Sequence, residues 1–232
     1  WFMSYIKTIG FDADDMLWHN ERFFGEAQDT LKDLLREYAD KETVSKAVLE
    51  MQRQNVKSLG YGIKSFTIAM MQVALDLSDG KLSANAMREV IDIGKNMMSH
   101  PVDFIDGVTN ILDDLSKSYE LVLITKGDLI DQERKVAISD VGKWFKHIEI
   151  VSEKCTNTYK NIFSRFGNMN ESVMVGNSIK SDAVPAVQAG AWGIHVPYPI
   201  TWELELAEPM INHECYFEAK SLSHAAEIIK SI

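Results

Sequence analysis

The second half of the chain alternates amphipathic helical segments with short apolar runs, and this alternation limits the possible folds more than any other feature. After Pro101, a helical segment over 107–119 is followed by an apolar run over 120–125, and three more such pairs reach residue 197. Strands that alternate with helices in this way form a parallel sheet with crossover helices on its faces. We therefore predict an α/β fold with a doubly wound, Rossmann-like parallel sheet.

Both ends of the chain add elements to this sheet. Residues 5–12, YIKTIGFD, are mostly β-branched and aromatic, and the run stops abruptly at acidic residues. This pattern is typical of a buried strand that carries carboxylates at its carboxyl end. Near the C-terminus, an apolar segment over 214–219 and a helical segment over 223–232 close the predicted fold.

A block of different character lies between the first strand and the rest of the sheet. Within 21–98, apolar residues recur at helical spacing in four segments, separated in part by glycine-containing turns at 60–62 and 78–80. We predict an α/β core made of residues 1–20 and 99–232, which carries the strand ends where chemistry is to be sought. The residues between them, 21–98, are predicted to form an inserted α-helical cap.

Composition excludes several classes of function. The 232 residues carry a formal net charge of -10, which argues against a general nucleic-acid binder. No apolar run is long enough to cross a bilayer, and the opening segment lacks the features of a signal peptide, so we expect no membrane partner and a cytoplasmic location. Cys155 and Cys215 lie far apart without metal-ligand spacing, which favours reduced thiols over a zinc site.

Polar residues cluster where the predicted strands end. Ligands of open parallel sheets bind beyond the carboxyl ends of the strands, so these residues are the candidates for chemistry. Several carboxylates brought together there repel one another unless a divalent cation neutralises them, and an all-oxygen set favours Mg²⁺. The strand ends carry Asp12, Asp14 and Asp15 after the first strand, Thr125, Lys126 and Gly127 after the next, then Glu153 and Lys154, and finally Asn177, Ser178 and Asp182.

These residue types suit the transfer of a phosphoryl group. A carboxylate held against a metal ion can attack phosphorus, while a second carboxylic acid protonates the leaving oxygen. Asp12 and Asp14 are two residues apart on the same side of an extended chain and suit these two roles. Thr125 can donate to a phosphoryl oxygen, and a lysine can neutralise the charge. Lys160 competes for that last role, but Lys154 directly follows a strand and is preferred.

The ordered set of motifs resembles the haloacid dehalogenase-like hydrolase superfamily with a helical cap of the first type. The chain matches its pattern with DADDM at 12–16, with Thr125, with Lys154 and with GNSIKSD at 176–182, in the family's order. The resemblance implies Asp12 as nucleophile and Mg²⁺ ligand, Asp14 as general acid/base and ligand through its main-chain carbonyl, Thr125 and Lys154 as phosphate-stabilising groups, and Asp182 and Asn177 in the metal shell.

Two positions depart from the family pattern, and a third position limits the class of bond that the protein is expected to cleave. Met16 stands where the pattern has Thr or Val, which affects the bracing of the loop. Asn177 stands where many members have Asp, so a neutral amide replaces one carboxylate of the metal shell. Family members that cleave carbon–halogen or phosphonate bonds generally lack an acid at the position of Asp14, so its presence favours phosphate esters.

The expected activity is Mg²⁺-dependent hydrolysis of a small phosphate monoester, taken from a phosphorylated metabolite, through an aspartyl-phosphate intermediate. Lys126 and Gly127 beside Thr125, and Tyr61 and Lys64 in a turn of the cap, are predicted to contact the substrate. For the cap turn, an ordinary interhelical connection with a solvated lysine is an equal alternative. Two other functions stay open: a phosphomutase that uses the same residues, and a protein that binds a ligand without turnover.

Overall fold

The structure, a computed structural model, describes residues 6–232 and forms two compact units. Residues 1–5, which include the start of the predicted core and of its first strand, lie outside the described residues. The first unit contains residues 6–19, Val102–Lys126 and Lys135–Ile232, and the second contains Asn20–Pro101 and Gly127–Arg134. In the described part of the chain, no helix has both the length and the apolar character needed to span a membrane.

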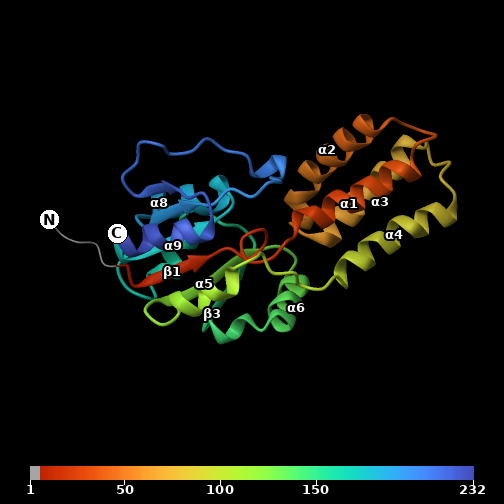
Figure 1. The fold of residues 1–232 in the computed structure, drawn as a ribbon. Helices are drawn as coiled ribbons and strands as arrows, with labels where there is room; N and C mark the ends of the chain where they lie inside the picture. The colour runs from red at the N-terminus through yellow and green to blue at the C-terminus, as the bar shows by residue number, and fades with distance from the viewer. Residues whose placement is uncertain (1–5) are drawn as a thin grey trace. The chain divides into compact units, whose positions relative to one another are not determined.

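The first unit is built on a six-stranded sheet in which every pair of neighbouring strands is parallel (Figure 1). The strands are β1 (Thr8–Phe11), β2 (Glu120–Lys126), β3 (His147–Val151), β4 (Ser172–Gly176), β5 (Trp192–His195) and β6 (Tyr216–Glu218). Their order, β3-β2-β1-β4-β5-β6, places β1 between β2 and β4. The predicted doubly wound parallel sheet is confirmed, and the apolar segment near the C-terminus is its last strand.

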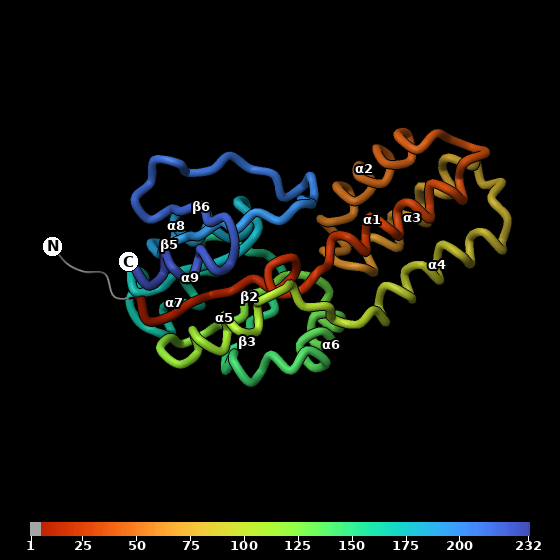
Figure 2. The backbone as a smooth tube through the Cα atoms, in the orientation of Figure 1, coloured from red at the N-terminus to blue at the C-terminus, as the bar shows by residue number. Residues whose placement is uncertain are grey.

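Helices cover both faces of this sheet. They are α5 (Val108–Leu115), α7 (Thr156–Phe163), α8 (Val184–Ala189) and α9 (Leu222–Ser231), together with the end of α6 (Leu129–Ser139). Apolar residues of α5 and α9 share one buried cluster, and those of α7 and α8 share another. Figure 2 traces the backbone, in which strands that are distant in the sequence, such as β1 and β4, are neighbours in the sheet.

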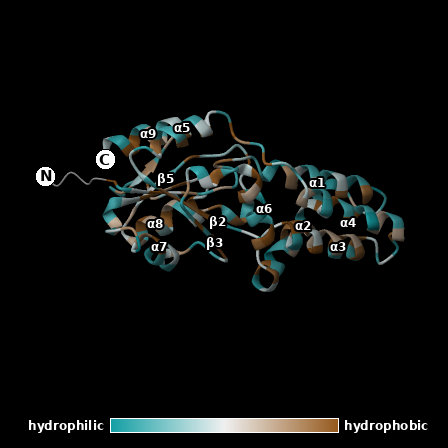
Figure 3. Cartoon of the chain, turned by 90° about the horizontal axis from the view of Figure 1, so that it is seen from below, coloured by the Kyte–Doolittle hydropathy of each residue, from teal (hydrophilic) through white to brown (hydrophobic). Residues whose placement is uncertain are grey.

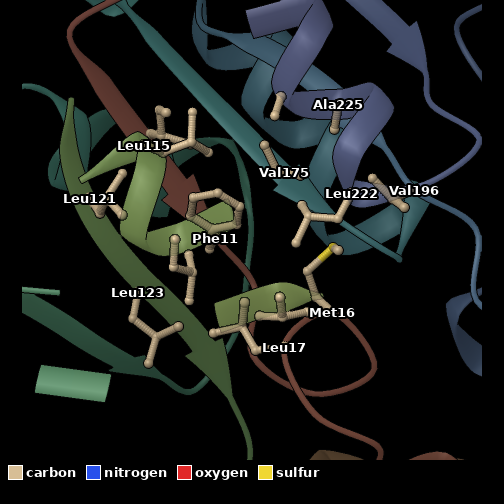
Figure 4. Packing of buried hydrophobic residues seen from close by; sticks show 14 of the residues in the cluster. Phe11, Met16, Leu17, Leu115, Leu121, Leu123, Val175, Val196, Leu222 and Ala225 are labelled. Carbon is tan, nitrogen blue, oxygen red and sulfur yellow. The ribbon is translucent and has the colours of Figure 1, made fainter. Parts of the chain in front are cut away.

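The two-residue period of the strands explains this division. Ile9 and Phe11 of β1 belong to the cluster with α5 and α9. The residue between them, Gly10, faces the other side, where an added Cβ would lie 2.9 Å from Phe163 of α7. Figure 4 shows Phe11 in its cluster, together with Met16. Met16 is 3% exposed, so in this chain the turn after β1 is braced by apolar packing.

The second unit contains the four helices that the sequence predicts. They are α1 (Glu21–Leu34), α2 (Lys41–Leu59), α3 (Ile63–Leu77) and α4 (Ala84–Met98). Figure 3 shows hydrophilic and hydrophobic residues mixed along these helices, as expected of amphipathic helices around a shared core. Gly60 and Gly62 have positive φ angles of 72° and 100°, which only glycine adopts without strain, and they end α2 and start α3.

Candidate active site

The carboxyl ends of β1, β2 and β4 deliver the predicted catalytic groups to one edge of the sheet. Phe11, the last residue of β1, is in register with Leu123 of β2 and with Val175 of β4. The next residue, Asp12, continues this pairing because its backbone N–H donates to the carbonyl of Val175 at 3.0 Å. Thr125 lies near the end of β2 and is 1% exposed. The sheet thus brings a buried carboxylate and a buried hydroxyl to the same edge.

A buried lysine joins two buried carboxylates at this edge. Lys154 Nζ lies 2.5 Å from Asp12 Oδ1 and 2.7 Å from Asp182 Oδ1. Asp182 is fully buried, and the side chain of Lys154 is 2% exposed. With both carboxylates ionised, the three side chains carry a net charge of −1 in a site with little exposure to solvent. Sequence reasoning preferred Lys154 over Lys160, and Lys154 is the lysine that meets the predicted nucleophile.

Burial and charge shift the proton affinities of this cluster. Desolvation by burial raises the pKa of Asp12 to about 7, with Lys154 opposing the shift and Asp182 adding to it. Burial alone would lower the pKa of Lys154, but the charges of Asp12 and Asp182 outweigh that effect and raise the pKa above its ordinary value. Lys154 therefore stays a cation and compensates the charge of the carboxylates beside it.

The loop after β4 is shaped to bring Asp182 back over the strand end. A Cβ added to Gly176 would lie 2.2 Å from Asp182 Oδ2, so only glycine allows the carboxylate to approach so closely. The backbone N–H of Ser178 donates to the same oxygen at 3.0 Å. Both carboxylate oxygens of Asp182 therefore accept hydrogen bonds, one from Ser178 and one from Lys154. Its predicted role as a metal ligand stays a prediction.

Oxygen atoms near Asp12 fit a hard cation. One terminal atom of the Asn177 amide lies 3.1 Å from Asp12 Oδ2 and 3.1 Å from the carbonyl oxygen of Asp14. In one orientation of the amide this atom is the nitrogen, which donates to both oxygens. In the other orientation it is the oxygen, and the three oxygens of Asn177, Asp12 and Asp14 could then bind one cation together. Ligand oxygens on an octahedral Mg²⁺ lie roughly 2.9 Å apart, which matches this spacing.

The oxygens that could bind a cation belong to different chemical groups. Within residues 6–232, no group of three or more His, Cys, Asp or Glu side chains has the arrangement of a metal site. The oxygens that fit Mg²⁺ come instead from one carboxylate, one main-chain carbonyl and one side-chain amide, on Asp12, Asp14 and Asn177 respectively. These three residues are among the four predicted metal ligands, and their role in binding Mg²⁺ stays a prediction.

The side chain of Asp14 is held by two donors that sequence reasoning did not connect with it. Its Oδ1 accepts a hydrogen bond from Trp18 Nε1 at 2.7 Å and another from Lys135 Nζ at 2.9 Å. Trp18 is 1% exposed and lies outside the motifs that pointed to the other site residues. Lys135 lies within a helix, away from every predicted strand end, so no motif pointed to it.

Lys126 lies within a second polar network at the same edge. Its Nζ contacts Glu205 Oε1 at 2.7 Å, Ser181 Oγ at 2.8 Å and Glu153 Oε1 at 3.3 Å. The hydroxyls of Ser178 and Ser181 also donate to Glu205 Oε2. Lys126 was predicted to contact the substrate, and the structure shows its charge already matched by carboxylates. Glu205 ends a single 3-10 turn, Glu203–Glu205, which is too short to show a periodic sequence pattern, so no motif pointed to it.

The remaining predicted contacts, Tyr61, Lys64 and Gly127, belong to the second unit. There Lys64 Nζ forms an ion pair with Asp128 Oδ1 at 3.1 Å. Gly127 has a φ of 153°, and Gly62 approaches Asp128 so closely that an added Cβ would lie 2.8 Å from its backbone nitrogen. Their contact with a substrate stays a prediction.

Solved structures of known proteins match the chain along almost its whole length. A haloacid dehalogenase-like family hydrolase from Xanthomonas campestris is 32% identical with a TM-score of 0.87, and the match covers 97% of this chain and 91% of that one. A putative HAD-hydrolase from Bacillus subtilis bound to magnesium is 15% identical with a TM-score of 0.65, covering 97% and 99%. A 2-haloacid dehalogenase from Pseudomonas syringae is 19% identical with a TM-score of 0.61, again covering 97% and 99%.

Identity of 32% over nearly the full length establishes the relationship that the motifs indicated. The chain belongs to the haloacid dehalogenase-like hydrolase family. The two more distant structures show the fold alone, and they include both a magnesium-bound protein and a dehalogenase. No protein-family model and no curated protein matches the sequence.

Proposed function

We propose that this protein is a Mg²⁺-dependent phosphatase that hydrolyses a small phosphate monoester through a phosphoaspartate on Asp12. The observation that carries the proposal is the pairing of two acids with different surroundings. Asp12 lies buried against Lys154 at 2.5 Å, whereas Asp14, two residues later, is held by other donors and keeps 22% of its side chain exposed. One acid is thus placed to attack, and the other to exchange protons with a substrate and with water.

In the first step, a carboxylate oxygen of Asp12 attacks phosphorus in line with the ester oxygen. The new bond joins Asp12 to phosphorus, the ester bond breaks, and Asp14 gives its proton to the departing alkoxide. Lys154 and Thr125 lie at the same strand ends and stabilise negative charge on the phosphoryl oxygens. The product of this step is a free alcohol and a phosphoaspartate.

In the second step, Asp14 takes a proton from water as the water oxygen attacks phosphorus. The bond between Asp12 and phosphorus then breaks, which releases inorganic phosphate and restores the carboxylate of Asp12. Asp14 ends the cycle protonated, ready for the next substrate. Each proton that Asp14 gives to an alcohol is therefore replaced by one from water.

Mg²⁺ would be held by Asp12 Oδ2, the carbonyl oxygen of Asp14 and the side-chain oxygen of Asn177, and Asp182 is a further candidate ligand. When bound, it would neutralise charge shared between the nucleophile and the phosphoryl group. Asn177 supplies a neutral oxygen where a carboxylate would supply a charged one, so we expect Mg²⁺ affinity to be weaker than with Asp at this position.

Asp14 also favours phosphate esters over haloacids as substrates. An alkoxide is a poor leaving group and departs much faster when an acid protonates it, whereas a halide leaves without a proton. A dehalogenase of this fold thus has no need for an acid at that position.

The substrates we propose are small phosphorylated metabolites in the cytoplasm. We propose that Tyr61, Lys64, Lys126 and Gly127 recognise them in part, and that the protein has no nucleic-acid or membrane partner.

The test is phosphate release from 4-nitrophenyl phosphate and a panel of phosphorylated metabolites, with Mg²⁺ or with chelator. We expect metal-dependent release by the wild type, loss of release with Asp12→Asn, and unchanged release with Asp106→Asn, an exposed acid in the same unit. Equal release by the wild type and Asp12→Asn would contradict the proposal. A rearranged phosphate ester in place of free phosphate would favour a mutase, and no release from any ester would favour a protein that only binds its ligand.

A further inference from the structure

The general acid of the proposed reaction is held by residues outside the family motifs. Asp14 Oδ1 accepts hydrogen bonds from both Trp18 Nε1 and Lys135 Nζ, at 2.7 and 2.9 Å. We infer that Lys135 is a positioning residue, which together with Trp18 fixes the carboxyl group of Asp14 so that its other oxygen, Oδ2, serves the leaving group. The inference rests on the proposed function and assigns a role to a residue that no motif includes.

The local chain brings Trp18 to Asp14. Asp15 adopts a left-handed conformation with φ 59°, and its backbone N–H donates to the carbonyl of Trp18 at 2.7 Å. The N–H of Leu17 donates to the carbonyl of Ala13 at 2.8 Å. This tight turn folds the chain back directly after Asp14. The indole of Trp18, four residues on, therefore lies against the carboxylate in a position set by the backbone.

Lys135 approaches the same oxygen from α6. It is the first residue of the helix that belongs to the sheet-containing unit, and its side chain is 10% exposed. A lysine with so little exposure needs a counter-charge, because an ammonium group removed from water without one is strongly unfavourable. The Asp14 carboxylate provides a counter-charge at 2.9 Å. Because both side chains are largely removed from solvent, this ion pair is held in one geometry, whereas an exposed surface ion pair can open to water.

Two donors on one oxygen fix the orientation of the Asp14 carboxyl group. The indole N–H of Trp18 and the ammonium group of Lys135 both point at Oδ1. Together they prevent the carboxyl group from rotating and so fix the direction in which Oδ2 points. General acid catalysis requires the acid within hydrogen-bond reach of the leaving oxygen, so this fixed orientation determines how well Asp14 works.

Leaving groups of different acidity separate positioning of the acid from a general structural role. We expect Lys135→Met to lower kcat about 100-fold for an alkyl phosphate, whose alkoxide needs a proton, but by under about threefold for 4-nitrophenyl phosphate, whose phenolate does not. KM should change little for either ester. Lys135→Arg should recover most of the alkyl phosphatase activity, and Trp18→Phe should show the same selectivity with a smaller loss. Lys160→Met, at an exposed lysine, is the matched control.

The outcomes distinguish this inference from the function on which it rests. Equal losses on both esters, or no loss on either, would overturn the positioning role while leaving the phosphatase intact. If the wild type hydrolysed neither ester, the proposed function and the inference would both be overturned. A selective loss on the alkyl ester in both Lys135→Met and Trp18→Phe would support the inference, even if one variant were less stable than the other.

Discussion

Two lysines at the carboxyl edge of the sheet show different ways of stabilising a buried cation. Lys154 lies between Asp12 and Asp182, and its side chain is 2% exposed. Lys126 lies between Glu205 and Glu153, and its side chain is 13% exposed. The partners of Lys154 come from strand ends and from the loop directly after β4. The principal partner of Lys126, Glu205, comes from a short 3-10 turn outside the sheet.

This difference indicates different roles for the two cations. Around Lys154, two nearly inaccessible carboxylates would repel each other without the lysine, so the cation is required by the site itself. Around Lys126, a serine hydroxyl and partly solvated carboxylates together stabilise the cation, and the side chain of Glu153 is 51% exposed. We therefore expect substitutions of Lys154 to lower stability and activity much more than those of Lys126.

The largest effect is expected for Lys154→Met. Removing one partner from a buried ion pair typically costs about 3–5 kcal/mol, because it leaves uncompensated charge behind. Here it leaves Asp12 and Asp182 facing each other, and phosphate release should fall by about 10³-fold or more. Urea unfolding at pH 7 and a phosphatase assay measure the two losses.

The matched variant for this prediction is Lys126→Met, for which we expect a loss of about 1–3 kcal/mol in the free energy of unfolding. Combining Lys154→Met with Asp182→Asn should restore part of the stability, since the second change removes one of the two repelling charges. If Lys126→Met destabilised the protein as much as Lys154→Met, the distinction between the two sites would be wrong.

The position of Asp182 beside Lys154 depends on Gly176, and Gly176→Ala should break that arrangement. The added Cβ would lie 2.2 Å from Asp182 Oδ2, so the carboxylate or the strand end must move. Overpacking of this kind costs about 1–3 kcal/mol, and the displaced Asp182 should also lower activity. Gly142→Ala is the control, because nothing lies within 4 Å of its added Cβ. Equal unfolding free energies for the two variants would contradict the close approach.

Much of the site around Lys154 could be predicted because it follows the regular part of the fold. A parallel sheet places strand ends together, so Asp12, Thr125 and Lys154 could be identified from where apolar runs stop. Lys135 and Glu205 could not be identified in this way. Lys135 lies within a helix and Glu205 in a single 3-10 turn, and their contacts depend on the tertiary path of the chain, which a periodic sequence pattern does not specify. The same limit applies to Tyr61 and Lys64, whose turn was predicted but whose partner Asp128 was not.

A smaller effect is expected for Glu205→Gln. The carboxylate accepts from Lys126, Ser178 and Ser181, and loss of a hydrogen bond to a charged group typically costs about 1.5–3 kcal/mol. The amide keeps the shape and one acceptor, so we expect a loss near the lower limit. A double-mutant cycle with Lys126→Met measures the coupling, and additive losses in the unfolding free energy would show that the pair does not interact.

The smallest effect concerns the pH dependence of the same group. Burial would raise the pKa of Glu205, but Lys126 and the two serines outweigh it and hold the pKa below its ordinary value of 4.5. An acid with a lowered folded-state pKa contributes stability that is present above 4.5 and is lost as pH falls through the folded-state pKa. The stability difference between wild type and Glu205→Gln should therefore be constant from neutral pH down to mild acid and shrink below 4.5.

Urea unfolding at several pH values measures this difference. Lys7 and Glu171 form an exposed ion pair in the same unit, and Glu171→Gln serves as the control for a carboxylate near the surface. A difference between wild type and Glu205→Gln that grew as the pH fell would contradict the assignment of Glu205 as the buried partner of Lys126.

The most direct test of the account is to trap the phosphoryl group on Asp12. In Asp14→Asn, 4-nitrophenyl phosphate should still phosphorylate the protein because its leaving group needs no proton, whereas hydrolysis of the phosphoaspartate lacks its base. Acid-quenched samples analysed by mass spectrometry should show one added phosphoryl group on the peptide that contains Asp12, and none in the Asp12→Asn, Asp14→Asn double variant. Phosphate release by the wild type, with no adduct on Asp12 in any variant, would contradict the account.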